Sequence, residues 1–272
     1  MTPTPRSSSR RRVLAWTVGA GAGAALLLTA VLGAWQPWRA PLAVPDAGSA
    51  AGGTTADAPA PDPLVLPADA SVLVFGDSWT HGSAATDPTR GYAYVLGELT
   101  GWQSVVDGVR GSGYLKPGID GPSFGERIAA LDPTLDPDLV IVQGSINDRL
   151  LVPDGYRAAV DAAWDALERI YPTASIVVLG PAPHVLPVDS GTASIDDALA
   201  GAAAARGWWY ISPLDEGWIT EINYLDVIDT GAGRNHPSTE GHAYLAERLA
   251  QALGERTAVT DAAADPAIDL EG

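Results

Sequence analysis

Short apolar runs rich in β-branched residues alternate with helical patterns along the middle of the chain. Five such runs end at turn-forming residues and occupy 71–75, 104–106, 139–142, 175–179 and 208–211. Continuous runs of this kind are typical of parallel strands that are buried on both faces. Apolar residues at helical spacing lie between and after them, at 92–99, 156–170, 195–205 and 238–253. This alternation predicts an α/β fold, a three-layer α/β/α sandwich around a mainly parallel five-stranded sheet.

The N-terminus has the pattern of a targeting segment. Arginines at positions 10–12 precede an uncharged, mainly apolar stretch over 13–35, which is long enough to cross a bilayer as a helix. We therefore expect residues 1–12 to stay in the cytoplasm and the chain after residue 35 to lie outside, anchored to the cell membrane by a single pass. The alternatives are a cleaved signal peptide with secretion, and a twin-arginine export signal.

Composition divides the remainder of the 272 residues. Residues 36–66 are rich in Pro, Ala and Gly and predict an extended linker, 67–255 hold every strand and helix pattern, and 256–272 predict an acidic disordered tail.

We expect the domain to be monomeric. The chain has no Cys, which excludes disulfides and thiolate metal sites. After residue 39 there are 33 acidic and 11 basic residues, so nucleic acid is not an expected partner.

Four polar motifs follow predicted strands or open the last predicted helix. Because ligands of parallel sheets bind beyond the carboxyl ends of the strands, these motifs are expected at one edge. Their central residues are Ser78, Gly111, Asn147 and His236. Taken singly, each motif is as readily a turn, a connecting loop or a helix cap. Together they supply a nucleophile, donors to an oxyanion and a general base, which is the chemistry of acyl transfer.

The order and spacing of the four motifs resemble the SGNH/GDSL hydrolase family over roughly residues 70–254. The resemblance implies a flavodoxin-like sheet and ester hydrolysis without metal or cofactor. Ser78 corresponds to the nucleophile and His236 to the base. The oxyanion donors correspond to the N–H groups of Ser78 and Gly111 and to the amide of Asn147, with Gly113 as a near alternative to Gly111.

Two positions depart from the family pattern. Gly233 stands three residues before His236, where an Asp is expected. The glycine of the third motif is either replaced by Ser145 or shifted to Gly144. Asp229, a backbone carbonyl, or no group at all could stand behind His236, and the last case implies lost activity. Asp77 and Asp148 are expected to support their turns rather than react.

The expected function is that of an extracytoplasmic serine esterase acting on acyl or acetyl groups of lipids, glycans or small molecules. The alternative is a non-catalytic cell-surface protein, descended from such a hydrolase, that binds glycans or acyl chains. The absent Asp is the main argument for this alternative.

Overall fold

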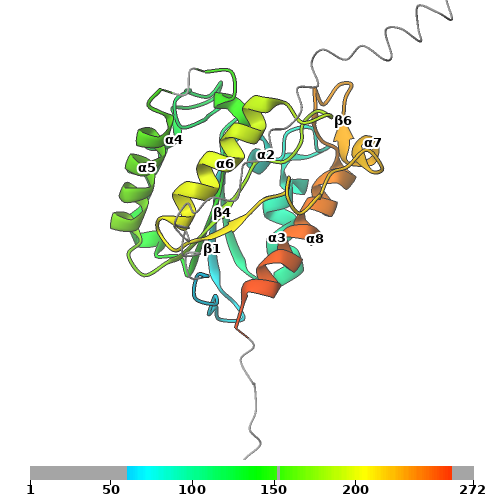
Figure 1. Ribbon diagram of the computed structural model, residues 1–272. Coiled ribbons are helices and arrows are strands. Elements are labelled where there is room, and N and C mark those ends of the chain that lie inside the picture. The colour runs from blue at the N-terminus through cyan, green and yellow to red at the C-terminus, as the bar shows by residue number, and fades with distance from the viewer. Residues whose placement is uncertain (1–59, 152–153, 259–272) are drawn as a thin grey trace, which may run out of the picture. The chain divides into compact units, whose positions relative to one another are not determined.

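The computed structural model of the chain describes residues 60–151 and 154–258. A parallel sheet runs through its centre in the order β2-β1-β3-β4-β5 (Figure 1). Its strands are β1 (Ser71–Gly76), β2 (Gln103–Gly108), β3 (Leu139–Gln143), β4 (Ser175–Leu179) and β5 (Trp209–Ile211). The predicted five-stranded parallel sheet is confirmed, and each predicted run contributes one strand.

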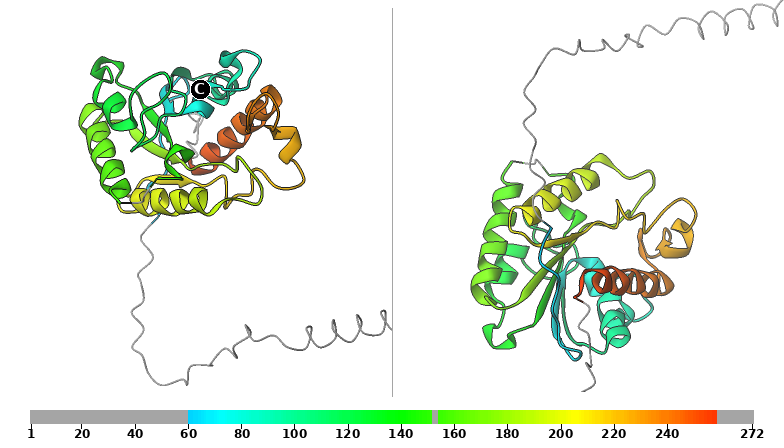
Figure 2. Two further views of the ribbon diagram at one scale, coloured as in Figure 1. Left: turned by 90° about the horizontal axis from the view of Figure 1, so that it is seen from above. Right: turned by 60° about the horizontal axis from the view of Figure 1, so that its bottom comes forward.

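Helices cover both faces of the sheet. Figure 2 shows the strands passing between two sets of helices. One face carries α3 (Tyr92–Thr100) and α8 (Thr239–Arg256), and the other carries α4 (Phe124–Ala129), α5 (Tyr156–Ile170) and α6 (Ser190–Ala204). Side chains alternate along β1 accordingly, because successive residues of a strand point to opposite faces. Val72 and Val74 pack with α3 and α8, whereas Leu73 and Phe75 pack with α4 and α5.

Several short elements were not predicted from the sequence. They are α2 (Ser78–His81), α4, α7 (Tyr224–Val227), the antiparallel pair β6 (Ile228–Asp229) and β7 (His236–Pro237), and 3₁₀ turns at Pro88–Arg90, Pro133–Leu135 and Ile146–Asp148. Two of them follow strands directly: α2 comes after β1, and the turn at 146–148 comes after β3. They therefore begin at the carboxyl edge of the sheet, where the candidate residues were expected.

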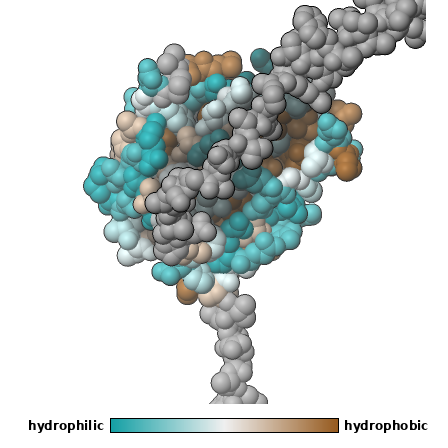
Figure 3. All heavy atoms as spheres, in the orientation of Figure 1, coloured by the Kyte–Doolittle hydropathy of each residue, from teal (hydrophilic) through white to brown (hydrophobic). Residues whose placement is uncertain are grey.

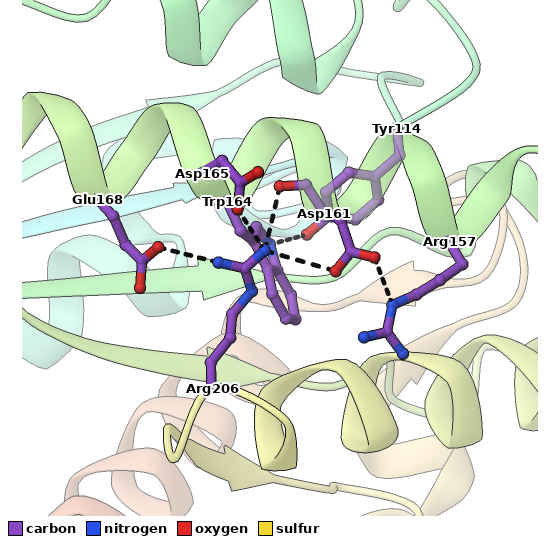
Figure 4. A network of polar contacts seen from close by, with 7 residues as sticks. All are labelled: Tyr114, Arg157, Asp161, Trp164, Asp165, Glu168 and Arg206. Atoms are coloured by element: carbon purple, nitrogen blue, oxygen red, sulfur yellow. Dashed lines mark hydrogen bonds and ion pairs between the residues drawn. The ribbon is translucent and has the colours of Figure 1, made fainter.

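A polar network, exposed at its ion pairs and buried at one hydrogen bond, links α5 to its neighbours (Figure 4). Arg206, in the turn after α6, bonds Asp165 at 2.6 Å and Glu168 at 2.9 Å on α5. On the same helix the Trp164 indole N–H donates to Tyr114 Oη at 2.8 Å. Tyr114 lies in the segment between β2 and α4, so this bond ties α5 to the segment that contains Gly111.

One face of the described domain is coloured by hydropathy in Figure 3. Figure 3 shows hydrophilic side chains over most of the visible face, with apolar side chains gathered around α7, where Ile222 and Leu225 are exposed. Within residues 60–151 and 154–258, no helix combines the length and apolar character needed to cross a bilayer. The predicted membrane segment 13–35 and its basic flank 1–12 lie outside the described residues, as do most of the predicted linker and tail.

Candidate active site

Ser78 opens a short helix directly behind the central strand. It is the first residue of α2, and the preceding Asp77 caps this helix by accepting a hydrogen bond from the Trp79 N–H at 2.9 Å. Glycine at position 76 leaves room for two buried side chains, because a Cβ there would lie 2.7 Å from Gln143 Oε1 and 3.0 Å from Gln143 Cβ. The tight turn places Ser78 at the carboxyl end of β1.

His236 contacts Ser78 from a loop near the C-terminal end of the domain sequence. It begins β7, which pairs with β6 so that His236 lies opposite Asp229. Its Nε2 lies 2.9 Å from Ser78 Oγ, the hydrogen-bond distance between a serine and its general base. Ser78 is only 8% exposed and His236 is half-buried. The two residues, 158 positions apart in sequence, thus form a shielded pair.

The group behind His236 is a backbone carbonyl. His236 Nδ1 lies 2.8 Å from Gly233 O. With Nδ1 protonated, the ring donates to Gly233 O and leaves Nε2 free to accept the proton of Ser78. The residue that replaces the expected Asp therefore orients the imidazole through its main chain.

The assignment of Asp229 as a triad acid is corrected by this geometry. The Asp229 carboxylate accepts hydrogen bonds from the Gly231 N–H at 2.8 Å and the Gly233 N–H at 2.9 Å. Its oxygens are thus turned to the loop rather than to the imidazole. Arg234 and Asn235 follow with φ of 53° and 63°, a left-handed pair that turns the chain back toward His236. Asp229 holds the loop that presents the Gly233 carbonyl.

Two backbone N–H groups at the site are free to bind an oxyanion. Within the described residues, neither the Ser78 N–H nor the Gly111 N–H donates to another protein group. Gly111 has a φ of 76°, which favours glycine, and it lines the same pocket as Ser78. The alternative donor, Gly113, already gives its N–H to Lys116 O at 2.9 Å. Gly111 is therefore the better placed of the two.

Asn147 lines the pocket from the 3₁₀ turn after β3. Its amide nitrogen lies 2.8 Å from Ser145 Oγ, 3.0 Å from Ser112 O and 3.3 Å from Asp77 Oδ2. Ser145 also accepts from the Asn147 N–H and donates to Ser112 O at 2.8 Å. The serine that replaces the expected glycine thus anchors Asn147, a role that the sequence did not reveal.

Asp77 and Asp148 have the supporting positions expected of them. Asp148 is buried and accepts from the N–H groups of Tyr114 at 2.7 Å and Lys116 at 3.1 Å. Burial raises the pKa of Asp148 above its ordinary value. Burial also raises the pKa of Asp77 to about 6, against the lowering effect of the Trp79 N–H bond. Both carboxylates fix backbone around the pocket.

Arg127 is a supporting residue that sequence reasoning missed. Its side chain is 5% exposed and donates to Gly76 O at 2.9 Å and to Asp107 O and Oδ1 at 2.7 Å each. It thereby joins the ends of β1 and β2 beneath the turn that carries Ser78. The available signal was the capping-box pattern of Ser123 and Glu126, which predicts a helix at this point.

These residues enclose a pocket of about 380 Å³ at the carboxyl edge of the sheet, lined among others by Ser78, Gly111, Asn147 and His236. A serine paired with an oriented imidazole, beside free backbone donors above a parallel sheet, defines the class of serine hydrolases with an α/β/α fold.

Comparison with known proteins identifies the family within that class. The family described as GDSL-like Lipase/Acylhydrolase matches residues 74–244. A GDSL lipase of Mycobacterium tuberculosis is 30% identical over 193 residues, which cover 66% of this chain and 79% of the relative. The chain therefore belongs to the GDSL-like lipase/acylhydrolase family, whose members are serine ester hydrolases.

Solved structures share the fold at lower identity. The aryl esterase of M. smegmatis has a TM-score of 0.52 at 16% identity, covering 68% of this chain and 98% of its own. A family two carbohydrate esterase from Clostridium thermocellum, solved in complex with cellohexaose, has a TM-score of 0.55 at 18% identity, covering 72% and 66%. Both support the α/β/α arrangement described above.

Proposed function

We propose that this protein hydrolyses carboxylic esters through an acyl-enzyme on Ser78, in a domain that lies outside the cytoplasm. The observation that carries the catalytic part is the 2.9 Å contact between Ser78 Oγ and His236 Nε2. This contact lies in the same pocket as Gly111, whose N–H is free. Nucleophile, base and oxyanion donors are thus assembled around one cavity.

In the first half-reaction His236 Nε2 takes the hydroxyl proton as Ser78 Oγ attacks the ester carbonyl carbon. The imidazolium that forms is held by Gly233 O, which accepts from Nδ1. His236 then gives its proton to the departing alcohol, and an acyl group remains on Ser78. In the second half-reaction His236 activates water, which releases the acid and restores the serine.

The oxyanion is held by the N–H groups of Ser78 and Gly111. Asn147 adds a third donor by turning one amide N–H away from Ser112 O, 3.0 Å distant, toward the oxyanion. Its bond to Ser145 Oγ at 2.8 Å keeps the amide in place meanwhile. The two backbone N–H groups are fixed before the reaction, so they need no reorganisation when the charge develops.

The substrate class is proposed from the relatives, and the location from the N-terminal sequence. The M. tuberculosis relative is named a lipase and the C. thermocellum neighbour a carbohydrate esterase, so acyl or acetyl groups of lipids or glycans are the first substrates to try. The extracytoplasmic location rests on the arginines at 10–12 and the apolar stretch 13–35. Protease treatment of intact cells tests it: the domain should be cleaved without lysis, and protection until lysis would refute it.

Hydrolysis of short-chain 4-nitrophenyl esters by the full chain tests the catalytic part. Ser78→Ala and His236→Ala should each lower kcat by at least about 10³-fold, because nucleophile and base act as a unit. Ser83→Ala is the matched control, since Ser83 lines the same pocket without contacting His236, and it should keep most of the activity. Equal rates in the wild type, Ser78→Ala and His236→Ala would refute catalysis and favour a binding protein.

A further inference from the structure

All the charged residues that line the pocket around Ser78 are basic. Arg110, Lys116 and Arg234 line it, and within the described residues no Asp or Glu does. The chain as a whole has 33 acidic residues against 16 basic ones, and Lys116 is its sole lysine. A basic lining therefore runs against the composition of the protein.

Two of the three cations are not neutralised. Arg110 makes two hydrogen bonds to Asp120, one of them at 2.9 Å. Lys116 and Arg234, by contrast, are exposed and have no carboxylate within ion-pair distance in residues 60–151 and 154–258. Within the described part of the chain, the pocket thus carries two positive charges that form no ion pair with a carboxylate.

Both residues have their main chain at the pocket. The Lys116 N–H donates to Asp148 Oδ1 at 3.1 Å, and Lys116 O accepts from the Gly113 N–H at 2.9 Å. Arg234 adjoins Gly233 in the loop that orients His236, and it has a φ of 53°. A side chain in this left-handed region costs about 1 kcal/mol that glycine avoids. An arginine is thus kept at the rim despite backbone strain.

We infer that the ester hydrolysed at Ser78 carries an anionic group, such as a carboxylate, which binds to Lys116 and Arg234. This inference rests on the proposed function and names its substrate class. Ammonium and guanidinium groups both form charge-assisted hydrogen bonds with carboxylate oxygens. The two cations come from the segment that contains Gly111 and from the His236 loop, so the anion lies near the reacting ester. The excess of acidic residues in the chain disfavours binding of such a substrate elsewhere.

Two matched substrate pairs test the inference on the full chain. Acetylated glucuronic acid against acetylated glucose places the charge on the alcohol part, and the 4-nitrophenyl monoester of succinic acid against 4-nitrophenyl butyrate places it on the acyl part. In at least one pair kcat/KM should favour the anionic member by about tenfold. Lys116→Gln and Arg234→Gln should each reduce that preference about threefold, and the double variant should bring it near parity. Salt at 0.5 M should also reduce it, because exposed charges are screened.

Arg169→Gln is the control for the loss of one positive charge. Arg169 is exposed in the last turn of α5, just before β4, at the opposite edge of the sheet, and its replacement should leave the preference unchanged. Equal kcat/KM within both pairs, or a preference that survives in the double variant, would overturn the inference while Ser78-dependent hydrolysis still upheld the proposed function. No Ser78-dependent hydrolysis of any of the four esters would overturn both.

Discussion

The substitution Asp229→Asn distinguishes two roles for this residue: a carboxylate that holds the loop, and the acid of a catalytic triad. Asp229 accepts two backbone hydrogen bonds, at 2.8 and 2.9 Å, from the loop whose Gly233 carbonyl orients His236. A hydrogen bond to a charged group contributes about 1.5–3 kcal/mol. Asparagine keeps one acceptor oxygen and the site is half-buried, so Asp229→Asn should lower the free energy of unfolding by about 1–2 kcal/mol.

If all of these ~1–2 kcal/mol are lost from stabilisation of the transition state, because Gly233 O is displaced, kcat falls about five- to thirtyfold. An asparagine in place of a true triad acid lowers kcat about 10⁴-fold in the serine proteases, because it favours the wrong tautomer. The assay is kcat for a 4-nitrophenyl ester at pH 8, with thermal unfolding of the same preparation. A fall of 10³-fold or more in a protein that stays folded would refute the assignment of the imidazole to the Gly233 carbonyl.

Three further outcomes are expected. Arg127→Met removes a buried guanidinium from Gly76 O and Asp107 and should lower the free energy of unfolding in urea by about 3–5 kcal/mol. Gly111→Ala forces an alanine to a φ of 76° with its Cβ 3.2 Å from Ile119 Cγ1, and kcat should fall about tenfold as the N–H moves off the oxyanion; an unchanged kcat would exclude this donor. Burial lowers the pKa of His242 to about 4, so the unfolded chain takes up the proton first as the pH falls. The stability from His242 is therefore present above pH ~6.5 and lost toward pH ~4, by at most about 3 kcal/mol, which urea unfolding of His242→Gln beside the wild type should reveal as a pH-dependent difference.

The sheet was predictable because its strands carry local signals. A run such as Leu139–Gln143 is buried at every residue, and such a sequence is typical of a strand covered on both faces. Boundaries were less predictable: α6 begins at Ser190 rather than 195, because Asp189 caps it by accepting from the Thr192 N–H at 3.0 Å. The short helix α4 depends on a capping box and on burial of Phe124 and Ile128 against α5. Its six residues are too few to show a helical period in the sequence.

The sequence predicted the parts of the site that are side chains, but not the main-chain group that orients His236. Ser78 and His236 are brought together as expected, because both follow from motifs at one sheet edge. The partner of His236 was left open, since a carbonyl has no side-chain signature. Its position depends on left-handed φ values at two non-glycine residues, Arg234 and Asn235, and on the Asp229 bonds that hold the loop. The buried contacts of Arg127 join residues far apart in sequence, and no sequence pattern indicates them either.

Covalent labelling of Ser78 tests the central claim most directly. The full chain is treated with an alkyl fluorophosphonate, whose phosphorus is attacked by an activated serine, and the adduct is located by mass spectrometry of its peptides. The account predicts a single adduct on Ser78 that forms at least about 10²-fold more slowly in His236→Ala, because the base is gone. A folded wild-type protein that acquires no adduct on Ser78, or acquires it equally fast without His236, would contradict the account.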